Sequence, residues 1–123
     1  MVRREKFSFK KRAQSFRYAF AGLVDFFIQE PNARIHLLAA IVVICLGFYF
    51  HLSARDWIVV IIAICLVFTA EAFNSCVEKL ADFISPDQDI RIKYIKDLSA
   101  GAVLVTAITA AIIGAIIFFP KFI

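Results

Sequence analysis

The sequence predicts an all-α membrane protein in which one helix lies on the membrane surface and three helices span the bilayer. The chain has 123 residues, of which 62% are hydrophobic, whereas ordinary globular chains contain about 45–50% apolar residues. Its mean hydropathy is +0.82. A water-soluble monomer of this length could not bury so much apolar surface. The length suits a single domain that covers residues 1–123.

The N-terminal region is both basic and aromatic. Seven of the 14 Lys and Arg residues occur within the first 17 residues. From about residue 9 to residue 29, Phe16, Phe20, Leu23 and Phe27 recur at helical spacing with charged residues between them. This pattern is typical of an amphipathic helix that lies near anionic headgroups and does not cross the bilayer. The positive charge therefore indicates a membrane partner, and we expect no nucleic-acid partner.

Three apolar segments follow the surface helix. We expect them to span the membrane over about residues 33–50, 57–83 and 98–119. Glu30-Pro31 separates the first span from the surface helix, because proline disfavours helical geometry at the residue before it. Ser85-Pro86-Asp87 ends the second span.

The distribution of basic residues predicts the orientation of the chain. The N-terminal segment carries seven, the region between the second and third spans carries four, and the first turn and the C-terminus carry only Arg55 and Lys121. Basic residues accumulate in cytoplasmic segments. We therefore expect the N-terminus and the second loop to be cytoplasmic.

Polar residues form a stripe on the second spanning helix, directly after its apolar run. Glu71, Asn74, Glu78 and Asp82 recur at i, i+3, i+7 and i+11, which places them within about 60° of one another on a helix. A carboxylate next to a membrane span costs free energy, so it indicates function more than packing. The alternative is that this part of the helix simply extends into the cytoplasm, with its charged side chains facing water. That interpretation explains Asp82 well but explains Glu71 poorly.

Clustered carboxylates support two kinds of chemistry. One carboxylate can act as a general base on a hydroxyl group, and several can bind Mg²⁺, which prefers oxygen ligands and usually also contacts substrate phosphates. Both fit phosphoryl transfer. Lys96 offers a cation for phosphate oxygens, and Asp97 next to it offers a carboxylate that can orient this lysine. Glu30, at the break between the surface helix and the first span, is a further candidate for an acidic site residue. The sequence contains no glycine-rich phosphate loop of the soluble kinases.

The stretch over residues 71–105, EAFNSCVEKLADFISPDQDIRIKYIKDLSAGAVLV, resembles the signature of the bacterial diacylglycerol kinase and undecaprenol kinase family. That signature is Glu-x-x-Asn-(Ser/Thr)-x-x-Glu-x-x-x-Asp, a short loop, and then Lys-Asp followed by small and apolar residues. The resemblance covers nearly the whole chain. It implies a homotrimer that transfers the γ-phosphate of ATP to a lipid hydroxyl at the cytoplasmic surface of the bacterial inner membrane, with the site shared between protomers.

The resemblance also implies roles for individual residues. Glu71 is similar to the family's general base, and Glu30 and Glu78 to its Mg²⁺-carrying pair. Asn74, Lys96 and Asp97 resemble active-site and nucleotide contacts. The remaining nucleotide-binding candidates are Tyr18, Lys11 and the loop residues Asp87, Gln88 and Asp89. The family commonly has His at the position of Asp89 and Arg at that of Lys11, so these two positions depart from its pattern.

Two lipids are candidates for the acceptor of the phosphate group. Asn32 and His36 after Glu30, and the C-terminal sequence IIGAIIFFPKFI, look more like the undecaprenol kinases than the diacylglycerol kinases. We therefore expect undecaprenol, with diacylglycerol as the alternative.

Two other classes of protein also place such residues in membrane helices. A proton-coupled transporter or channel subunit predicts a carboxylate near the bilayer midplane, whereas the acids here lie near a membrane face. A structural subunit explains the small residues Ala107, Ala111 and Ala115, but it does not explain the polar stripe.

Overall fold

A computed structural model describes residues 4–87 and 89–123. In this part of the chain it contains four α-helices: α1 (Phe9–Gln29), α2 (Pro31–Tyr49), α3 (Ala54–Ile84) and α4 (Ile90–Phe118). A short 3-10 turn, η1 (Phe119–Lys121), follows α4. The predicted all-helical architecture is confirmed. Helices α2, α3 and the α4–η1 segment are each long and apolar enough to cross a membrane.

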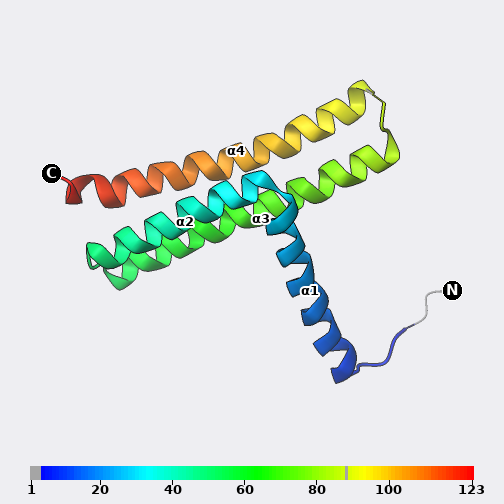
Figure 1. Cartoon of the computed structure of the whole chain (residues 1–123), viewed down its shortest axis with the longest axis horizontal. Coiled ribbons are helices and arrows are strands. Elements are labelled where there is room, and N and C mark those ends of the chain that lie inside the picture. The colour runs from blue at the N-terminus through cyan, green and yellow to red at the C-terminus, as the bar shows by residue number, and fades with distance from the viewer. Residues whose placement is uncertain (1–3, 88) are drawn as a thin grey trace.

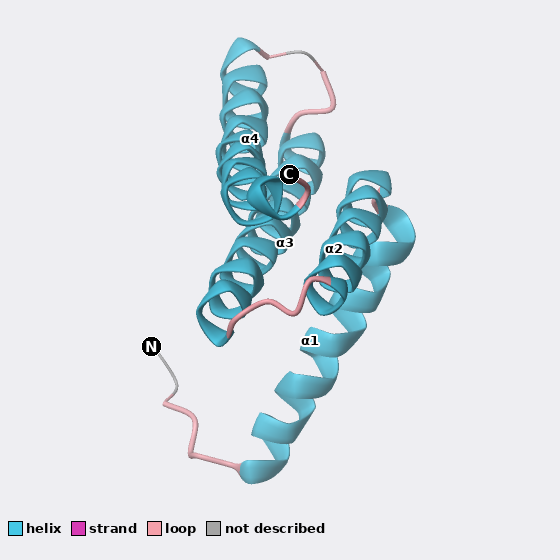
Figure 2. Cartoon of the chain, turned by 90° about the vertical axis from the view of Figure 1, so that its left-hand side faces the viewer, coloured by secondary structure: helices cyan, strands magenta, loops and turns pink. Residues whose placement is uncertain are grey.

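The three long helices lie side by side, with α3 between α2 and α4 (Figures 1 and 2). Helix α1 joins the N-terminal end of α2 and then runs away from the other helices (Figure 1). A small core closes the end of the bundle near the α2–α3 turn, where Leu52, Val60 and Phe118 are buried against one another. Helix α3 therefore carries the contacts that hold the chain together.

The break between α1 and α2 follows from proline chemistry. Glu30 is extended, with φ −102° and ψ 111°, and Pro31 begins α2. The proline ring excludes helical geometry at the preceding residue, while its own fixed φ and missing N–H suit the first turn of a helix. Glu30 is thereby held at the corner between two helices.

The turn from α2 to α3 is tight. His51 has a positive φ of 54°, a conformation that histidine adopts more readily than most residues. The Leu52 N–H then donates to the Gly47 carbonyl at 3.1 Å, which satisfies an open carbonyl at the helix end. Ser53 caps α3 by accepting from the Asp56 N–H at 3.2 Å.

The helices extend beyond the segments that hydropathy predicts. Helix α3 begins at Ala54, ahead of the predicted 57, and α4 begins at Ile90, well ahead of the predicted 98. The reason is that helix formation needs caps and hydrogen bonds, whereas hydropathy reports only the apolar part. Asp89 caps α4 by accepting from the Arg91 N–H at 2.8 Å. Lys96 and Asp97 consequently lie within α4 rather than at its first residues.

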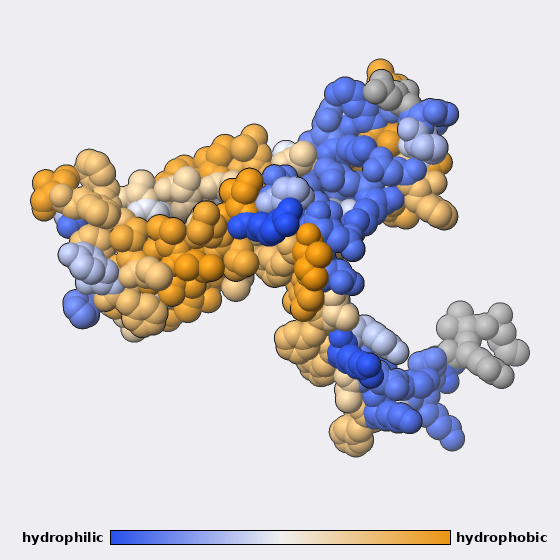
Figure 3. Space-filling model, viewed as in Figure 1, coloured by the Kyte–Doolittle hydropathy of each residue, from blue (hydrophilic) through white to orange (hydrophobic). Residues whose placement is uncertain are grey.

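Most apolar side chains are uncovered in the single chain. The accessible surface is 9972 Å², whereas a compact globular monomer of this mass exposes about 6,700 Å². Apolar surface extends over most of the α2–α4 bundle, and polar surface gathers at the end that carries the α3–α4 loop (Figure 3). This arrangement is that of a membrane protein, whose apolar surface faces lipid or a further membrane helix.

Candidate active site

The polar stripe of α3 passes from the buried interior to the exposed end of the helix. Glu71 is 4% exposed and Asn74 is 8% exposed, Glu78 is partly buried, and Asp82 is exposed. Because α3 is continuous from Ala54 to Ile84, these four residues share one side of the helix. Glu71 is therefore the most enclosed carboxylate of the stripe.

Glu71 contacts a residue of α2 that was not among the predicted site residues. The Nε2 atom of His36 lies 3.1 Å from Oε1 of Glu71. The carboxylate side chain is 5% exposed and the imidazole 27% exposed. The sequence does hold one signal for this pair, since a histidine and a glutamate both interrupt apolar helices, but neither pattern reveals how the two helices are aligned.

Asn74 and Glu78 form the next contact along the stripe. The Asn74 amide donates to Oε1 of Glu78 at 3.5 Å, which is a long hydrogen bond. Among the described residues no group donates a hydrogen bond to the side-chain amide oxygen (Oδ1) of Asn74, although this oxygen is buried. A buried polar atom without a partner costs free energy. It is therefore available to a donor that the single chain does not supply.

Glu30 is tied to α3 through Lys79, the sequence neighbour of Glu78. Lys79 donates to Oε1 of Gln29 at 3.1 Å and lies 3.9 Å from Oε1 of Glu30. These contacts attach the corner between α1 and α2 to α3. Within the described ranges, no three His, Cys, Asp or Glu side chains gather closely enough to hold a metal ion. Any metal bound by Glu30 and Glu78 would therefore need ligands beyond the described carboxylates and imidazoles of one chain, such as substrate phosphates.

A cavity of about 560 Å³ lies between the end of α3 and the start of α4, a volume typical of sites for small molecules. Asp82 and Lys96 meet beside it, with Nζ of Lys96 2.7 Å from Oδ1 of Asp82. Lys93 and Asp97 form an ion pair one turn apart on α4. Four of the predicted nucleotide-binding residues line this cavity: Asp87, Asp89, Lys96 and Asp97.

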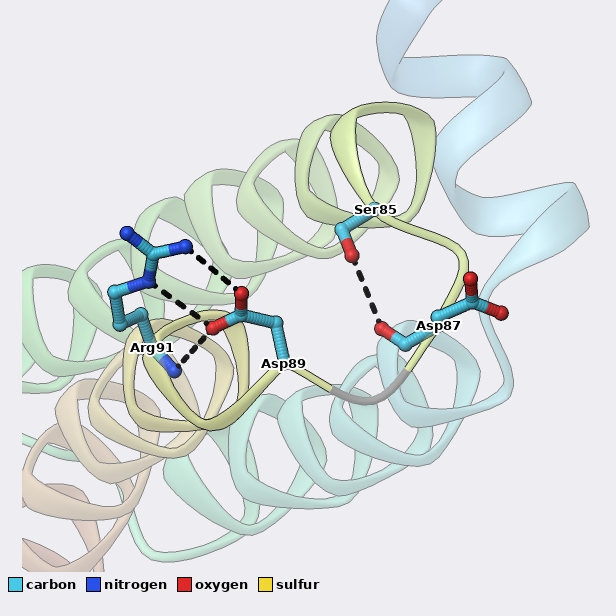
Figure 4. A network of polar contacts seen from close by, with 4 residues as sticks. All are labelled: Ser85, Asp87, Asp89 and Arg91. Atoms are coloured by element: carbon cyan, nitrogen blue, oxygen red, sulfur yellow. Dashed lines mark hydrogen bonds and ion pairs between the residues drawn. The ribbon is translucent and has the colours of Figure 1, made fainter.

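The α3–α4 loop shapes one wall of this cavity. The Ser85 hydroxyl donates to the Asp87 carbonyl at 3.1 Å, and the Arg91 side chain donates to both carboxylate oxygens of Asp89 (Figure 4). These bonds from Arg91 lower the pKa of Asp89 to about 2, so the carboxylate stays ionised at neutral pH. Gln88, also predicted to contact nucleotide, lies outside the described residues.

Lys11 and Tyr18 are not brought to this cavity within one chain. Both lie on α1, where Lys11 pairs with Glu5 at 3.3 Å and Tyr18 is 69% exposed. The N-terminal half of α1 extends away from the α3–α4 loop (Figures 1 and 2). These two residues can meet the others only if α1 moves or if a second chain supplies them.

A second large cavity, of about 500 Å³, lies between α1 and α3. Its apolar lining comes from Ala19, Gly22, Leu23 and Phe26 of α1 and from Ala72 and Cys76 of α3, and Asp25, Gln29 and Lys79 line it as well. Glu30 and Ser75 also line it. An apolar space therefore adjoins the polar stripe on the side of α3 that faces α1.

Comparisons with known proteins decide the family. Residues 17–118 match the family described as prokaryotic diacylglycerol kinase. The chain belongs to the prokaryotic diacylglycerol kinase family. It is 35% identical over 108 residues to an undecaprenol kinase of Bacillus subtilis, and this alignment covers 88% of both chains. It is also 36% identical over 107 residues to a diacylglycerol kinase of Synechocystis, covering 86% of this chain and 61% of that one.

Membership of the prokaryotic diacylglycerol kinase family makes the chain a lipid kinase, and therefore an enzyme that uses ATP. The family and its three apolar helices together make it a membrane protein. The buried carboxylate, the polar stripe and the cavity at the α3–α4 loop are the features of this chain that can serve such a reaction.

Proposed function

We propose that this kinase transfers the γ-phosphate of ATP to the hydroxyl group of undecaprenol at the cytoplasmic surface of the bacterial inner membrane. The observation that carries the proposal is Glu71, a buried carboxylate at the end of an apolar run on a helix long enough to span the bilayer. A base at that depth meets the hydroxyl of a lipid rather than that of a soluble substrate. Diacylglycerol is the alternative acceptor.

In the proposed reaction Glu71 is the general base. It accepts the proton of the lipid hydroxyl as the oxygen attacks the γ-phosphorus, and ADP leaves. A positioned base contributes about 10²–10⁴-fold to such a step. The apolar cavity between α1 and α3 supports a lipid site at this depth, because Ala72 and Ser75 line it close to Glu71.

The residues present fit Mg²⁺ as the cofactor of ATP. Mg²⁺ is usually bound by one or two carboxylates together with substrate phosphates, and Glu30 and Glu78 supply carboxylates near the polar stripe. The buried side-chain oxygen of Asn74, which has no partner among the described residues, would add a further oxygen to this set of donors. Bound Mg²⁺ would neutralise the charge of the transferred phosphoryl group.

The cavity at the α3–α4 loop supports a nucleotide site. Its acidic residues Asp87 and Asp89 can accept hydrogen bonds from ribose and adenine, as can Gln88 next to them. Lys96 can pair with phosphate oxygens, with Asp97 beside it. This division follows from charge, since carboxylates repel phosphates and attract hydroxyl and amino donors.

We further propose a homotrimer with sites shared between protomers. Within one chain, Lys96 lies far from Glu71. It contacts Asp82, which is 11 residues after Glu71 and therefore about 16 Å farther along α3. Tyr18 and Lys11 lie on α1, which extends away from the α3–α4 loop (Figure 1). In addition, only 11% of the apolar stretch within the α4–η1 segment is buried in the single chain. The small residues Ala107, Ala111 and Ala115 of α4 can allow close contact with a neighbouring helix.

The surface helix and the orientation complete the proposal. Along α1, apolar surface gathers on one side and polar surface on the other (Figure 3), which supports an amphipathic helix in the membrane interface. The excess of basic residues before and within the first half of α1, and around the α3–α4 loop, supports a cytoplasmic N-terminus and a cytoplasmic site.

The choice of undecaprenol has its own support. The alignment with the undecaprenol kinase covers 88% of both chains, whereas that with the diacylglycerol kinase covers 61% of the relative. The test is purified protein with radiolabelled ATP and Mg²⁺ in mixed micelles that contain either undecaprenol or diacylglycerol. We expect the higher kcat/KM for undecaprenol. A higher value for diacylglycerol establishes the alternative, and no labelled lipid in either case refutes the proposed reaction.

A further inference from the structure

His36 is the residue that contacts the proposed base. We infer that His36 is a positioning residue that donates from Nε2 to Oε1 of Glu71 and so leaves Oε2 free to accept the proton of the lipid hydroxyl. This inference rests on the proposed role of Glu71 as base. It assigns to α2 a part in the reaction that the polar stripe of α3 does not contain.

The geometry of the pair is that of a hydrogen bond between two enclosed groups. The two residues are 35 positions apart in the chain, and their side chains meet between α2 and α3 at 3.1 Å. The Glu71 side chain is nearly inaccessible, whereas the imidazole keeps about a quarter of its surface. Among the described residues, Glu71 makes no other ion pair or side-chain hydrogen bond.

The direction of the hydrogen bond follows from the chemistry of the base. A general base must be ionised, and an ionised carboxylate can only accept hydrogen bonds. Nε2 of His36 must therefore carry the proton, whether the ring is neutral or charged. Nδ1, on the other side of the ring, takes no part in this contact.

The surroundings strengthen this bond. His36 lines a cavity of about 100 Å³ together with apolar side chains, among them Ala40, Val43, Val67 and Phe68. A hydrogen bond to a charged acceptor is stronger than a neutral one, and weak screening by apolar neighbours strengthens it further. The pair thus has few competing partners and a fixed orientation.

Fixing one oxygen of a carboxylate sets the direction of the other. Catalytic bases are commonly oriented by a third group, and misplacing a reacting atom by 1 Å costs about 10²-fold in rate. His36 does not line the loop cavity that is proposed to hold the nucleotide. Loss of His36 should therefore lower kcat and leave KM for ATP unchanged.

The first test compares His36→Leu with His36→Gln in the purified full-length enzyme. A glutamine amide can donate from nearly the position of Nε2, whereas leucine cannot. We expect His36→Leu to lower kcat by about 10- to 100-fold, with KM for ATP unchanged, and His36→Gln to recover a large part of the loss. His51→Asn is the matched control, because His51 lies at the other end of α2, and it should keep the activity of the parent enzyme. Full kcat in His36→Leu, or equal loss in both variants, overturns the inference.

A second test needs no variant of His36. The chain contains 2 histidines, so isotope-labelled histidine gives two sets of ring resonances that His51→Asn assigns. We expect Glu71→Gln to shift the Nε2 resonance of His36 and not that of His51. An unchanged His36 resonance overturns the inference. The same Glu71→Gln protein separates the two claims: if it is inactive while His36→Leu is fully active, only the positioning role fails, whereas if it is active, the proposed base fails as well.

Discussion

Lys96 of α4 reaches back to Asp82 of α3, and its ammonium nitrogen lies 2.7 Å from a carboxylate oxygen. The two residues are 14 positions apart and stand on either side of the α3–α4 loop. This ion pair joins the exposed end of the polar stripe to the lysine proposed to contact ATP. It therefore sets the direction in which Lys96 presents its charge.

Asp82→Ala should raise KM for ATP, because Lys96 loses the partner that orients it. The effect on thermal stability should be small, since both side chains are substantially exposed and exposed ion pairs contribute only about 0–1 kcal/mol. Steady-state kinetics and a thermal melt in detergent measure the two effects. Asp56→Asn, at the other end of α3, is the control. An unchanged KM would show that Lys96 is positioned without Asp82.

Glu30→Ala and Glu78→Ala should each raise the Mg²⁺ and ATP concentrations needed for half-maximal activity, because each removes a proposed carboxylate ligand. Activity should return in part at high Mg²⁺. Glu30→Ala also removes the carboxylate beside Lys79, so a melt is needed to show that α1 remains attached. If neither variant responds to Mg²⁺ or ATP and both bind nucleotide normally, the metal assignment is wrong.

Mixing Glu71→Gln with Lys96→Ala tests whether protomers share a site. Each variant should be inactive alone. If the two residues of one site come from different protomers, mixed trimers contain some sites with both residues intact, and activity returns in part. Crosslinking confirms that subunits exchange. Background activity at every mixing ratio, with exchange confirmed, would place both residues in the same protomer.

Gly47→Ala should destabilise the bundle. A Cβ atom at this position would lie 2.5 Å from the Trp57 ring and 3.1 Å from Leu52. Overpacking of this kind typically costs about 1–3 kcal/mol. Gly114→Ala is the control, because no other described part of the chain lies within 4 Å of its added Cβ. A lower melting temperature in detergent for Gly47→Ala alone is the expected result, and equal melting temperatures would show that Trp57 can move aside.

The helices could be predicted from the sequence, but their ends only in part. Apolar periodicity and Pro31 located the break at Glu30. Helix α4 begins ahead of the apolar segment from residue 98, because Arg91, Lys93 and Lys96 lower the hydropathy of residues that are nevertheless helical. Its cap, Asp89, is a local hydrogen-bonding feature that hydropathy does not register.

The polar stripe could be predicted because it depends only on helical spacing within α3. The contact between His36 and Glu71 could not, because it depends on how α2 and α3 align. The positions of Lys11 and Tyr18 relative to the loop cavity depend on the direction of α1. The proposed contacts with a second chain depend on the geometry of the interface between protomers. Neither is encoded in the spacing of residues along one helix.

The central claim is that Glu71 is the base for phosphorylation of a membrane lipid. The most direct test compares the parent enzyme with Glu71→Gln in mixed micelles that contain undecaprenol, Mg²⁺ and radiolabelled ATP. Glutamine keeps the size of the side chain but cannot accept the proton. We predict labelled undecaprenyl phosphate with the parent enzyme and a loss of about 10²–10⁴-fold in kcat with the variant, while the variant still binds ATP and keeps the oligomeric state of the parent enzyme. Turnover by Glu71→Gln close to that of the parent enzyme would contradict the account.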